Sequence, residues 1–390
     1  MKYLLKHGHL VVDGNREYLD GAMLIEDEKI LDVFPQTNKV KDYEDAEVID
    51  LHGSLVMPGN FDTHTHGING VGFDNATKEE LDKASYDMAM SGTTSFLASI
   101  SYDGMPNAGG EGFEDYLNRR FDLFNTYEGL YARFEGLHME GPFLSKKHLG
   151  IGNPDKFLLP DVNMVKNVLS HTDKLRQMTI AYELDGAKEV GKLLKEHDVK
   201  VMCGHSDALV DNLDENVDGF THLFNAMRGM HHRDITLVNG AFMNKWMCEI
   251  ITDGNHIDRN VLSLVIKNIH KDKLMIVSDS STARGLADGE YIFMSRNCIK
   301  KGTSIITDDG HYAGSVVSIN DEMKVLKELG ATYTDLLRYS SLNAFKFYGL
   351  DKLFGTLEKG KYSDIVIMDD NLNIKNVMVK GKFIYDAVLY

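Results

Sequence analysis

The sequence is short of cysteine, of long apolar runs and of positive charge, and each shortage excludes a class of protein. Its 390 residues contain three cysteines, Cys203, Cys248 and Cys298, which lie far apart in the chain. They provide no disulfide framework and favour a reducing compartment. The N-terminal residues lack the apolar core of a signal peptide, and no apolar run could span a bilayer. We therefore expect a cytoplasmic protein with no membrane partner.

The charge balance also excludes some partners. The chain has 59 acidic and 42 basic residues, which gives a net charge of −17. Such a surface repels nucleic acids and anionic membranes, so we expect neither as a partner. An anionic substrate would need a local basic site. The length and the hydrophobic fraction of 43% fit a soluble protein with one large domain and a smaller one.

The central part of the chain alternates short apolar runs with amphipathic stretches of helical period. This alternation predicts parallel βα units, and eight such units close into a barrel. The runs span residues 54–61, 94–98, 134–139, 178–182, 199–203, 219–224, 247–251 and 274–277. The predicted fold class is therefore α/β, with a (β/α)8 TIM-like barrel.

Both chain ends show short strands separated by turns instead. Asp13-Gly14 marks a hairpin near the N-terminus, and apolar runs at 364–368 and 376–379 lie near the C-terminus. Neither end has enough strands to bury a core alone. We predict that residues 1–57 and 355–390 together form a small β-sandwich domain, and that residues 58–354 form the barrel.

Residue types that bind metals follow the predicted barrel strands. His64 and His66 end the first strand two residues apart, so both side chains point to the same face. Five further acids and histidines lie at the ends of later strands: Glu140, His205, His222, His256 and Asp279. Barrel active sites lie at the carboxyl ends of the strands, so these side chains are predicted to meet there. A single histidine after a strand is usually an ordinary residue, but ligand types at six of eight strand ends favour a metal site.

Asp279 has an alternative explanation. Ser278-Asp279-Ser280 is rich in residues that cap helix N-termini, and Asp279 could be such a cap. Its position at the end of the last strand favours a catalytic role.

Several motifs together resemble the amidohydrolase superfamily and, within it, the N-acetylglucosamine-6-phosphate deacetylase family. The resemblance covers nearly the whole chain. The motifs include Pro58-Gly59-Asn60-Phe61-Asp62-Thr63-His64-Thr65-His66-Gly67, His138-Met139-Glu140-Gly141-Pro142-Phe143, Gly204-His205-Ser206-Asp207-Ala208, Thr221-His222-Leu223-Phe224-Asn225-Ala226-Met227, Asp253-Gly254-Asn255-His256 and Ser278-Asp279.

The resemblance implies roles for the residues at the strand ends. The matched metal ligands are Glu140, His205 and His222, with His64 and His66 as a second-metal pair. Asp279 matches the catalytic acid/base. The implied cofactor is a divalent metal ion, zinc or iron, with one or two ions per subunit and two favoured.

The resemblance also implies a set of substrate-binding residues: Ile151, Gly152, Asn225, Ala226, Arg233, His256, Tyr312, Ala313 and Gly314. His256 and Arg233 match contacts to a sugar phosphate, and the matching arginine comes from a neighbouring subunit, so a homodimer is implied. The chain departs from the family pattern in the same region. Gly152 stands where many members have a carbonyl-polarising histidine, His148 is nearby but out of register, and Arg228 stands where proline is usual.

The predicted function is metal-dependent hydrolysis of the acetamide of N-acetylglucosamine 6-phosphate to glucosamine 6-phosphate and acetate. The galactosamine epimer stays open, because the two substrates differ in the configuration of one hydroxyl. A cyclic amidase of the dihydroorotase or dipeptidase type is a second alternative, although those relatives usually have a carboxylated lysine and no strand-end lysine appears here. A barrel without activity is a third, against which the retained Asp279 and metal ligands argue.

Overall fold

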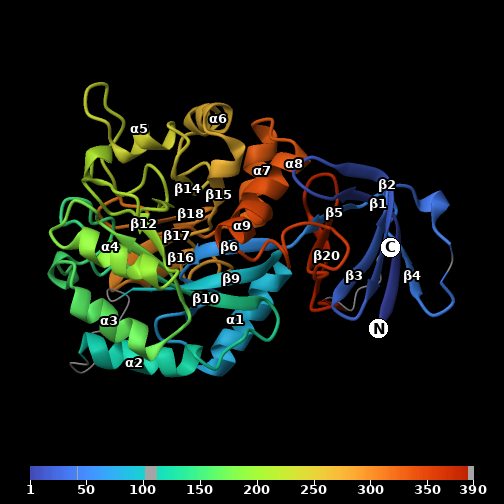
Figure 1. Cartoon of the computed structure of the whole chain (residues 1–390), viewed down its shortest axis with the longest axis horizontal. Helices are drawn as coiled ribbons and strands as arrows, with labels where there is room; N and C mark the ends of the chain where they lie inside the picture. The colour runs from blue at the N-terminus through green and yellow to red at the C-terminus, as the bar shows by residue number, and fades with distance from the viewer. Residues whose placement is uncertain (42, 102–111, 385–390) are drawn as a thin grey trace.

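The computed structural model describes residues 1–41, 43–101 and 112–384, and it contains two large sheets, one of them surrounded by helices (Figure 1). The helix-covered sheet has eight strands in the order β15-β14-β13-β12-β11-β10-β9-β6, and every neighbouring pair is parallel. Its strands are β6 (Asn60–Thr65), β9 (Thr93–Ile100), β10 (Arg133–Glu140), β11 (Leu175–Ile180), β12 (Lys200–Cys203), β13 (Gly219–Phe220), β14 (Met247–Ile250) and β15 (Leu274–Ile276). The barrel prediction is confirmed.

Helices cover the outside of the barrel. They are α1 (Lys78–Met90), α2 (Phe113–Phe124), α3 (Val162–His171), α4 (Ala187–Glu196), α5 (Leu237–Ala241), α6 (Arg259–Asn268), α7 (Ile319–Glu328), α8 (Tyr333–Leu337) and α9 (Asn343–Phe347). The first begins at a capping box, in which the Thr77 hydroxyl accepts from the Glu80 amide and the Glu80 carboxylate accepts from the Thr77 amide. Its buried residues Leu81, Ala84 and Met88 are spaced for one helix face, which packs on the sheet.

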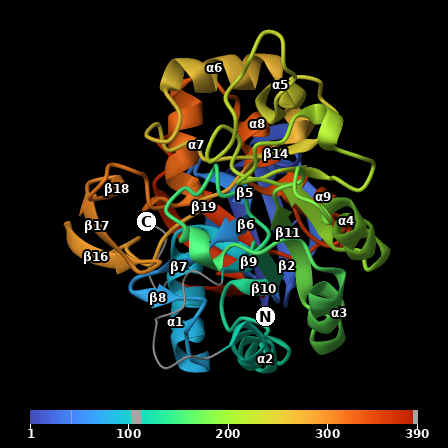
Figure 2. The ribbon, with the colours of Figure 1, turned by 90° about the vertical axis from the view of Figure 1, so that its left-hand side faces the viewer.

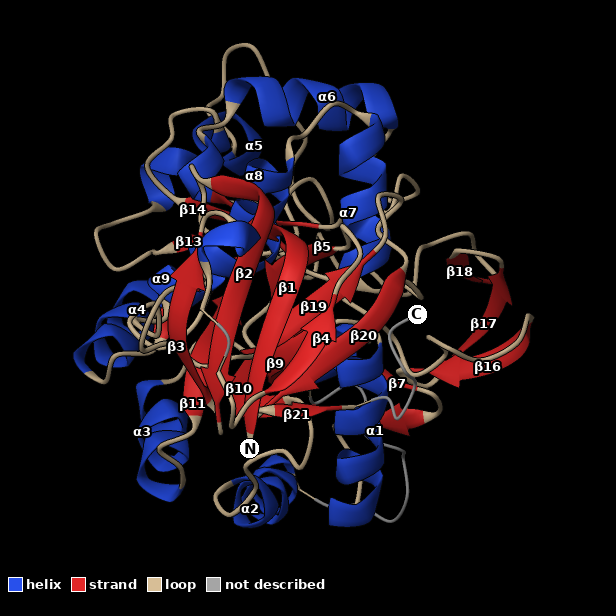
Figure 3. Cartoon of the chain, turned by 90° about the vertical axis from the view of Figure 1, so that its right-hand side faces the viewer, coloured by secondary structure: helices blue, strands red, loops and turns tan. Residues whose placement is uncertain are grey.

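The second large sheet combines strands from both chain ends (Figure 3). Its strand order is β21-β20-β19-β5-β1-β2-β3, with β4 paired to β1 beside β5. The strands are β1 (Lys2–Val11), β2 (Glu17–Glu26), β3 (Lys29–Phe34), β4 (Glu47–Asp50), β5 (Leu55–Pro58), β19 (Ile365–Met368), β20 (Ile374–Val379) and β21 (Lys382–Phe383). The domain boundaries stay a prediction, and residues 385–390 of the predicted small domain lie outside the described residues.

The predicted strand 54–61 is wrong as a single element. The structure divides it at Gly59, so that β5 belongs to the terminal sheet and β6 starts the barrel at Asn60. The Gly59 amide donates to the carbonyl of Asp364, the residue before β19 of the terminal sheet, while a Cβ at Gly59 would lie 2.0 Å from Thr94 Oγ1 of the barrel. Only glycine lets the chain pass this closely between the two sheets.

Two small antiparallel sheets stand at the edge of the barrel mouth. One is made of β16 (Gly289–Phe293), β17 (Arg296–Lys301) and β18 (Ser304–Thr307), which lie to one side of the barrel in Figure 2. The other is the pair β7 (Gly67–Ile68) and β8 (Val71–Gly72), which follows the first barrel strand directly. Among the helices of the described residues, none is both long and apolar enough to cross a membrane.

Candidate metal centre and substrate cavity

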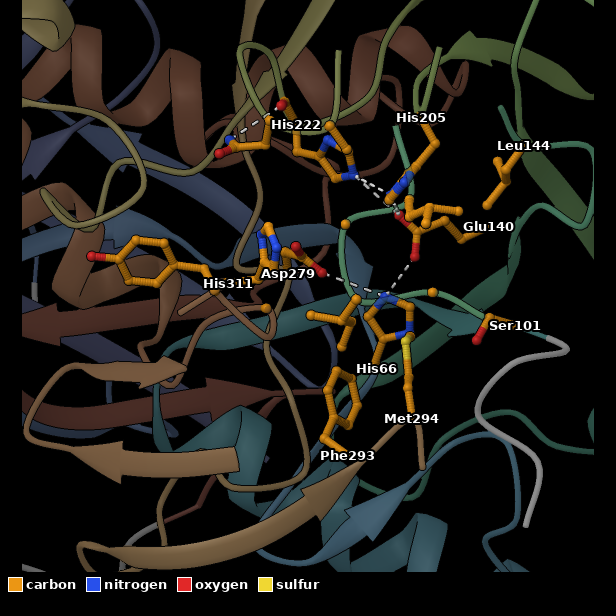
Figure 4. A pocket seen from close by; sticks show the side chains of 18 of the residues that line it. His66, Ser101, Glu140, Leu144, His205, His222, Asp279, Phe293, Met294 and His311 are labelled. Atoms are coloured by element: carbon orange, nitrogen blue, oxygen red, sulfur yellow. Dashed lines mark hydrogen bonds and ion pairs between the residues drawn. The ribbon is translucent and has the colours of Figure 1, made fainter. Parts of the chain in front are cut away.

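The predicted ligand residues meet at the carboxyl ends of five barrel strands. His64 lies in β6 and His66 just after it, and Glu140 is the last residue of β10. The other three follow their strands by two or three residues: His205 after β12, His222 after β13 and Asp279 after β15. Figure 4 shows five of these side chains pointing into one cavity. They form two groups of potential metal ligands.

The loop group consists of Glu140, His205 and His222. The Nε2 atoms of the two histidines are 3.2 Å apart, and they lie 3.2 Å and 3.1 Å from Oε1 of Glu140. Around an ion with ligand bonds of about 2.1 Å, tetrahedral ligand atoms are about 3.4 Å apart. The spacing of these three atoms therefore fits a single divalent ion without rearrangement.

The seam group consists of His64, His66 and Asp279, where β6 meets the end of β15. The two Nε2 atoms are 3.3 Å apart, and they lie 3.5 Å and 3.4 Å from Oδ1 of Asp279. This spacing again matches the edges of a tetrahedral coordination shell. The sequence placed these residues at the first and last strands, and the closure of the barrel brings them together.

Glu140 connects the two groups. Its Oε1 atom faces the loop group, and its Oε2 atom lies 3.1 Å from Nε2 of His66. One carboxylate with an oxygen on each side is the arrangement by which a bridging ligand holds two neighbouring ions. The donor set of imidazoles and carboxylates suits zinc or iron rather than magnesium or calcium.

The electrostatics of the centre favour a bound cation. Burial would lower the pKa of His66, but its hydrogen bonds to Asp279 and Glu140 raise that pKa to about 9. Burial would likewise raise the pKa of Glu140, but the charge of His64 and hydrogen bonds from the histidines hold it well below its usual value. The carboxylates thus stay ionised and attract positive charge. Metal binding here would displace protons from the histidines.

Outer hydrogen bonds orient two of the histidines. Nδ1 of His64 lies 3.4 Å from Oε2 of Glu249 in β14, and Oε1 of Glu249 also accepts from Nε2 of Gln177 at 2.8 Å. Nδ1 of His205 donates to the carbonyl oxygen of His148 at 2.9 Å. In both rings the proton on Nδ1 leaves Nε2 free to face the centre as a metal ligand.

Three of the ligand residues have a left-handed backbone. The φ angles are 46° at His205, 30° at His222 and 45° at Asp279, a region that residues other than glycine rarely adopt. Backbone strain of this kind clusters at functional sites, where the surrounding structure imposes it. The chain continues as turns beyond Asp279, so the alternative that Asp279 caps a helix is wrong.

The cavity beside the centre contains most of the predicted substrate-binding residues. Those that line it are Ile151, Gly152, Asn225, Ala226, His256, Tyr312 and Gly314. Ala313 is fully buried next to Gly314 and does not line the cavity. Arg233 is exposed outside it, with Nη1 2.9 Å from Nε2 of the neighbouring His232. Within this one chain, Arg233 is therefore separate from the cavity.

Several lining residues were missed from the sequence: Leu144, Leu149, Gly150, Lys156, Phe157, Phe293, Met294 and His311. Phe293 ends β16 and Met294 begins the turn to β17, and both lie beside His66 (Figure 4). Positive φ angles at Met294 and Ser295 indicate a type I′ turn, a turn type that the sequence Met-Ser does not predict. The only sequence signal that the cavity wall differs from the family pattern was the set of departures in this region, such as Gly152 and Arg228.

His148 does not replace the missing carbonyl-polarising histidine. Its side chain is not among those that line the cavity, and its Nε2 atom lies 3.1 Å from Oδ1 of Asp207. Asp207 also accepts from Arg228 at 3.0 and 2.8 Å and from Lys147 at 2.8 Å. The hydrogen bonds from Arg228, together with those from Lys147 and His148, hold the pKa of Asp207 well below its usual range.

The sequence matches a known family and known relatives. The family model described as "Amidohydrolase family" matches residues 175–384, more than half of the chain. The chain is 29% identical to an N-acetylglucosamine-6-phosphate deacetylase of Bacillus subtilis (strain 168), covering 96% of this chain and 95% of that protein. It is 28% identical to an N-acetylgalactosamine-6-phosphate deacetylase of Escherichia coli O157:H7, covering 86% of this chain and 89% of the relative.

The fold also matches solved structures. An N-acetylglucosamine-6-phosphate deacetylase from Pasteurella multocida superimposes with a TM-score of 0.88 at 24% identity, covering 98% of this chain and 99% of that one. The match extends through the barrel and the terminal sheet, which supports the fold as a whole. Together with the family model, it confirms the resemblance seen in the motifs: the chain belongs to the amidohydrolase family.

Proposed function

We propose that the protein is a metal-dependent deacetylase of an acetamido-sugar phosphate, with N-acetylglucosamine 6-phosphate as the favoured substrate. The observation that carries this proposal is the position of Glu140. Its carboxylate lies between the two ligand groups and at the wall of the cavity. The two curated relatives act, by their names, on sugar phosphates of this kind.

Each reacting group has a residue in reach. A divalent ion held by either ligand group would acidify a water molecule and polarise the substrate carbonyl. Asp279 lies at the cavity with its carboxylate ionised, since the charge of His64 and the hydrogen bond of His66 outweigh the burial that would raise its pKa. It would accept the proton of the attacking water and then deliver it to the amide nitrogen as the C–N bond breaks. The products are acetate and the free amine.

The cavity also has groups suited to a sugar phosphate. His256 lines the cavity, and its Nδ1 atom lies 2.9 Å from Oδ2 of Asp253, which fixes the ring and directs Nε2 away from that partner. Arg233 of a second copy of the chain would add a guanidinium to a cavity whose own lining includes one lysine, Lys156. A guanidinium suits this role, because it donates two parallel hydrogen bonds to phosphate oxygens.

We also propose a two-ion centre of zinc or iron. Both ligand groups have tetrahedral spacing, and Glu140 has one oxygen toward each. Gly152 stands in place of a carbonyl-polarising histidine, and His148 is paired to Asp207, so a second ion in the seam group would help to polarise the carbonyl in place of that imidazole.

The test combines metal analysis with an amine-release assay on the two epimeric substrates. Rapid release from N-acetylglucosamine 6-phosphate, with a lower kcat/KM for the galactosamine epimer, would support the proposal. The reverse preference would assign the alternative substrate. Hydrolysis of a dihydropyrimidine or dipeptide without amine release from either sugar would favour the cyclic-amidase class, and metal-loaded protein inactive on all of them would contradict an enzymatic function.

A further inference from the structure

Two loops at the barrel mouth hold each other through one residue, His148. Its carbonyl oxygen accepts from Nδ1 of His205 at 2.9 Å, and its Nε2 atom lies 3.1 Å from Oδ1 of Asp207. The Ser145 amide adds a third link, since it donates to the carbonyl of His205 at 2.8 Å. His205 thus contacts the backbone carbonyl of His148, and Asp207 contacts its side chain.

Arg228 extends this contact to a third loop. Its Nε and Nη2 atoms donate to the two oxygens of Asp207 at 3.0 and 2.8 Å, which is the paired geometry that a guanidinium favours with a carboxylate. The Asp207 side chain is only 13% exposed. The Ser206 amide also donates to the carbonyl of Ala226 at 3.1 Å, so backbone as well as side-chain hydrogen bonds connect the loops after β12 and β13.

The hydrogen bond between the His148 carbonyl and the His205 ring controls which nitrogen of His205 faces the metal centre. A carbonyl oxygen can only accept, so the His148 carbonyl requires the proton of a neutral His205 ring to be on Nδ1. Nε2 is then unprotonated and lies 3.2 Å from Oε1 of Glu140. If His148 moved, the ring would lose this constraint on its tautomer and its orientation.

The contact between His148 and His205 also positions one wall of the cavity. Leu149, Gly150 and Ile151 follow His148 and line the cavity directly. Gly150 has a φ of 58°, and a Cβ added there would lie 3.0 Å from Cε1 of His205. This wall therefore rests against the ring whose position His148 fixes.

We propose that Asp207, paired with Arg228, is a positioning residue that holds His148 so that His205 presents Nε2 to the loop group. The inference rests on the proposed metal centre, but not on the identity of the substrate. It assigns a purpose to an arginine that stands where the family usually has proline. Positioning contacts of this kind typically change metal affinity or activity by about 10- to 100-fold when removed.

Lys147 offers a matched control. Its Nζ atom contacts the same carboxylate at 2.8 Å, but its side chain is 73% exposed and it makes no contact with His205 among the described residues. If Asp207 serves only to balance surface charge, Lys147 should matter as much as His148. If Asp207 acts through His148, then Lys147→Ala should change metal retention by no more than about twofold, as is typical of exposed ion pairs.

The experiment measures metal loss from the holoenzyme in excess chelator, with no substrate present. We expect Asp207→Ala and His148→Ala each to speed the loss of one ion by about 10- to 100-fold. The double variant should be no faster than the singles, because both remove one contact. Each variant's KM should rise as well, since the cavity wall shifts with the ring.

Unchanged metal loss in both single variants would overturn the inference, as would equal acceleration by Lys147→Ala. If Asp207→Ala does not fold, His148→Ala and Arg228→Met decide, since both side chains are partly exposed and neither change leaves a buried charge alone. Because chelation needs no substrate, a protein that binds metal but is inactive on sugar phosphates would contradict the proposed function without affecting this result.

Discussion

The seam group and the loop group have similar ligands but are held in different ways. In the seam group the backbone itself is fixed: the Asp279 amide donates to the carbonyl of His64, and the His66 amide donates to the carbonyl of Ser280. In the loop group, His205 and His222 follow short strands, and His205 depends on side-chain contacts between loops. Barrel closure therefore fixes the backbone of the seam group directly, whereas the orientation of the His205 ring in the loop group also depends on contacts between side chains of different loops.

The largest effect is expected from Asp279, which belongs to the seam group but also reaches the cavity. Asp279→Asn should fold and retain metal yet lose about 100- to 10,000-fold in kcat, because an amide cannot accept the water's proton. Steady-state kinetics and elemental analysis on one preparation would show this. Near-normal turnover would remove Asp279 from the acid/base role and leave it as a ligand only.

Removing the seam histidines tests whether both groups hold an ion. His64→Gln combined with His66→Asn should lower the metal content from two equivalents to one and reduce kcat by about 100-fold, the lower end of typical losses for a catalytic group. Elemental analysis of unchelated protein gives the stoichiometry. One equivalent in active wild-type protein, with the double variant fully active, would refute a two-ion centre.

Substitution of Arg233 tests whether a second copy of the chain completes the substrate cavity. Arg233→Ala should raise KM by about 10- to 100-fold with a smaller change in kcat, because a charge-assisted hydrogen bond to phosphate contributes roughly 1.5–3 kcal/mol. Mixing it with Asp279→Asn should restore part of the activity after subunit exchange, since a mixed dimer has one site with both residues intact. Demonstrated exchange without recovery would exclude a shared site. Arg259→Ala, another exposed arginine, should leave KM unchanged.

The smallest effect concerns a buried acid in α7, near the seam. Burial and the negative charges of Asp253 and Asp62 raise the pKa of Glu322 well above its usual value. The unfolded chain releases this proton near pH 4.5, so the acid lowers the folding stability as pH rises from there toward its folded pKa. Glu322→Gln should therefore raise Tm by a few degrees at pH 8 and by less at pH 5. A constant difference across this range would contradict the assignment.

The sequence correctly predicted where candidate ligands lie when their spacing follows the strand period. His64 and His66 share a strand face by their spacing, and Glu140 ends a strand whose residues 134–139 were predicted from apolarity alone. The barrel geometry then required these positions to meet. The prediction of one strand over residues 54–61 failed at Gly59. The apolar run is continuous there, so it gives no sign that the chain passes from the terminal sheet to the barrel.

The support around the site was also not visible in the sequence. Glu249 contacts His64 from β14, 185 residues away in the chain, and a buried glutamate in a strand has no local signature. Phe293 and Met294 reach the cavity only because a hairpin folds over the barrel mouth. Such contacts depend on how elements pack, which the pattern of one segment does not encode.

The terminal sheet has a consequence for how the chain is made. β5 pairs with β1 on one side and with β19 on the other, so its second edge is completed only by residues 365–368. While the ribosome synthesises the whole barrel, the nascent N-terminal strands carry an unpaired apolar edge, a feature prone to pairing with other chains. A message truncated before β19 would therefore yield a product that aggregates, even with every metal ligand already translated.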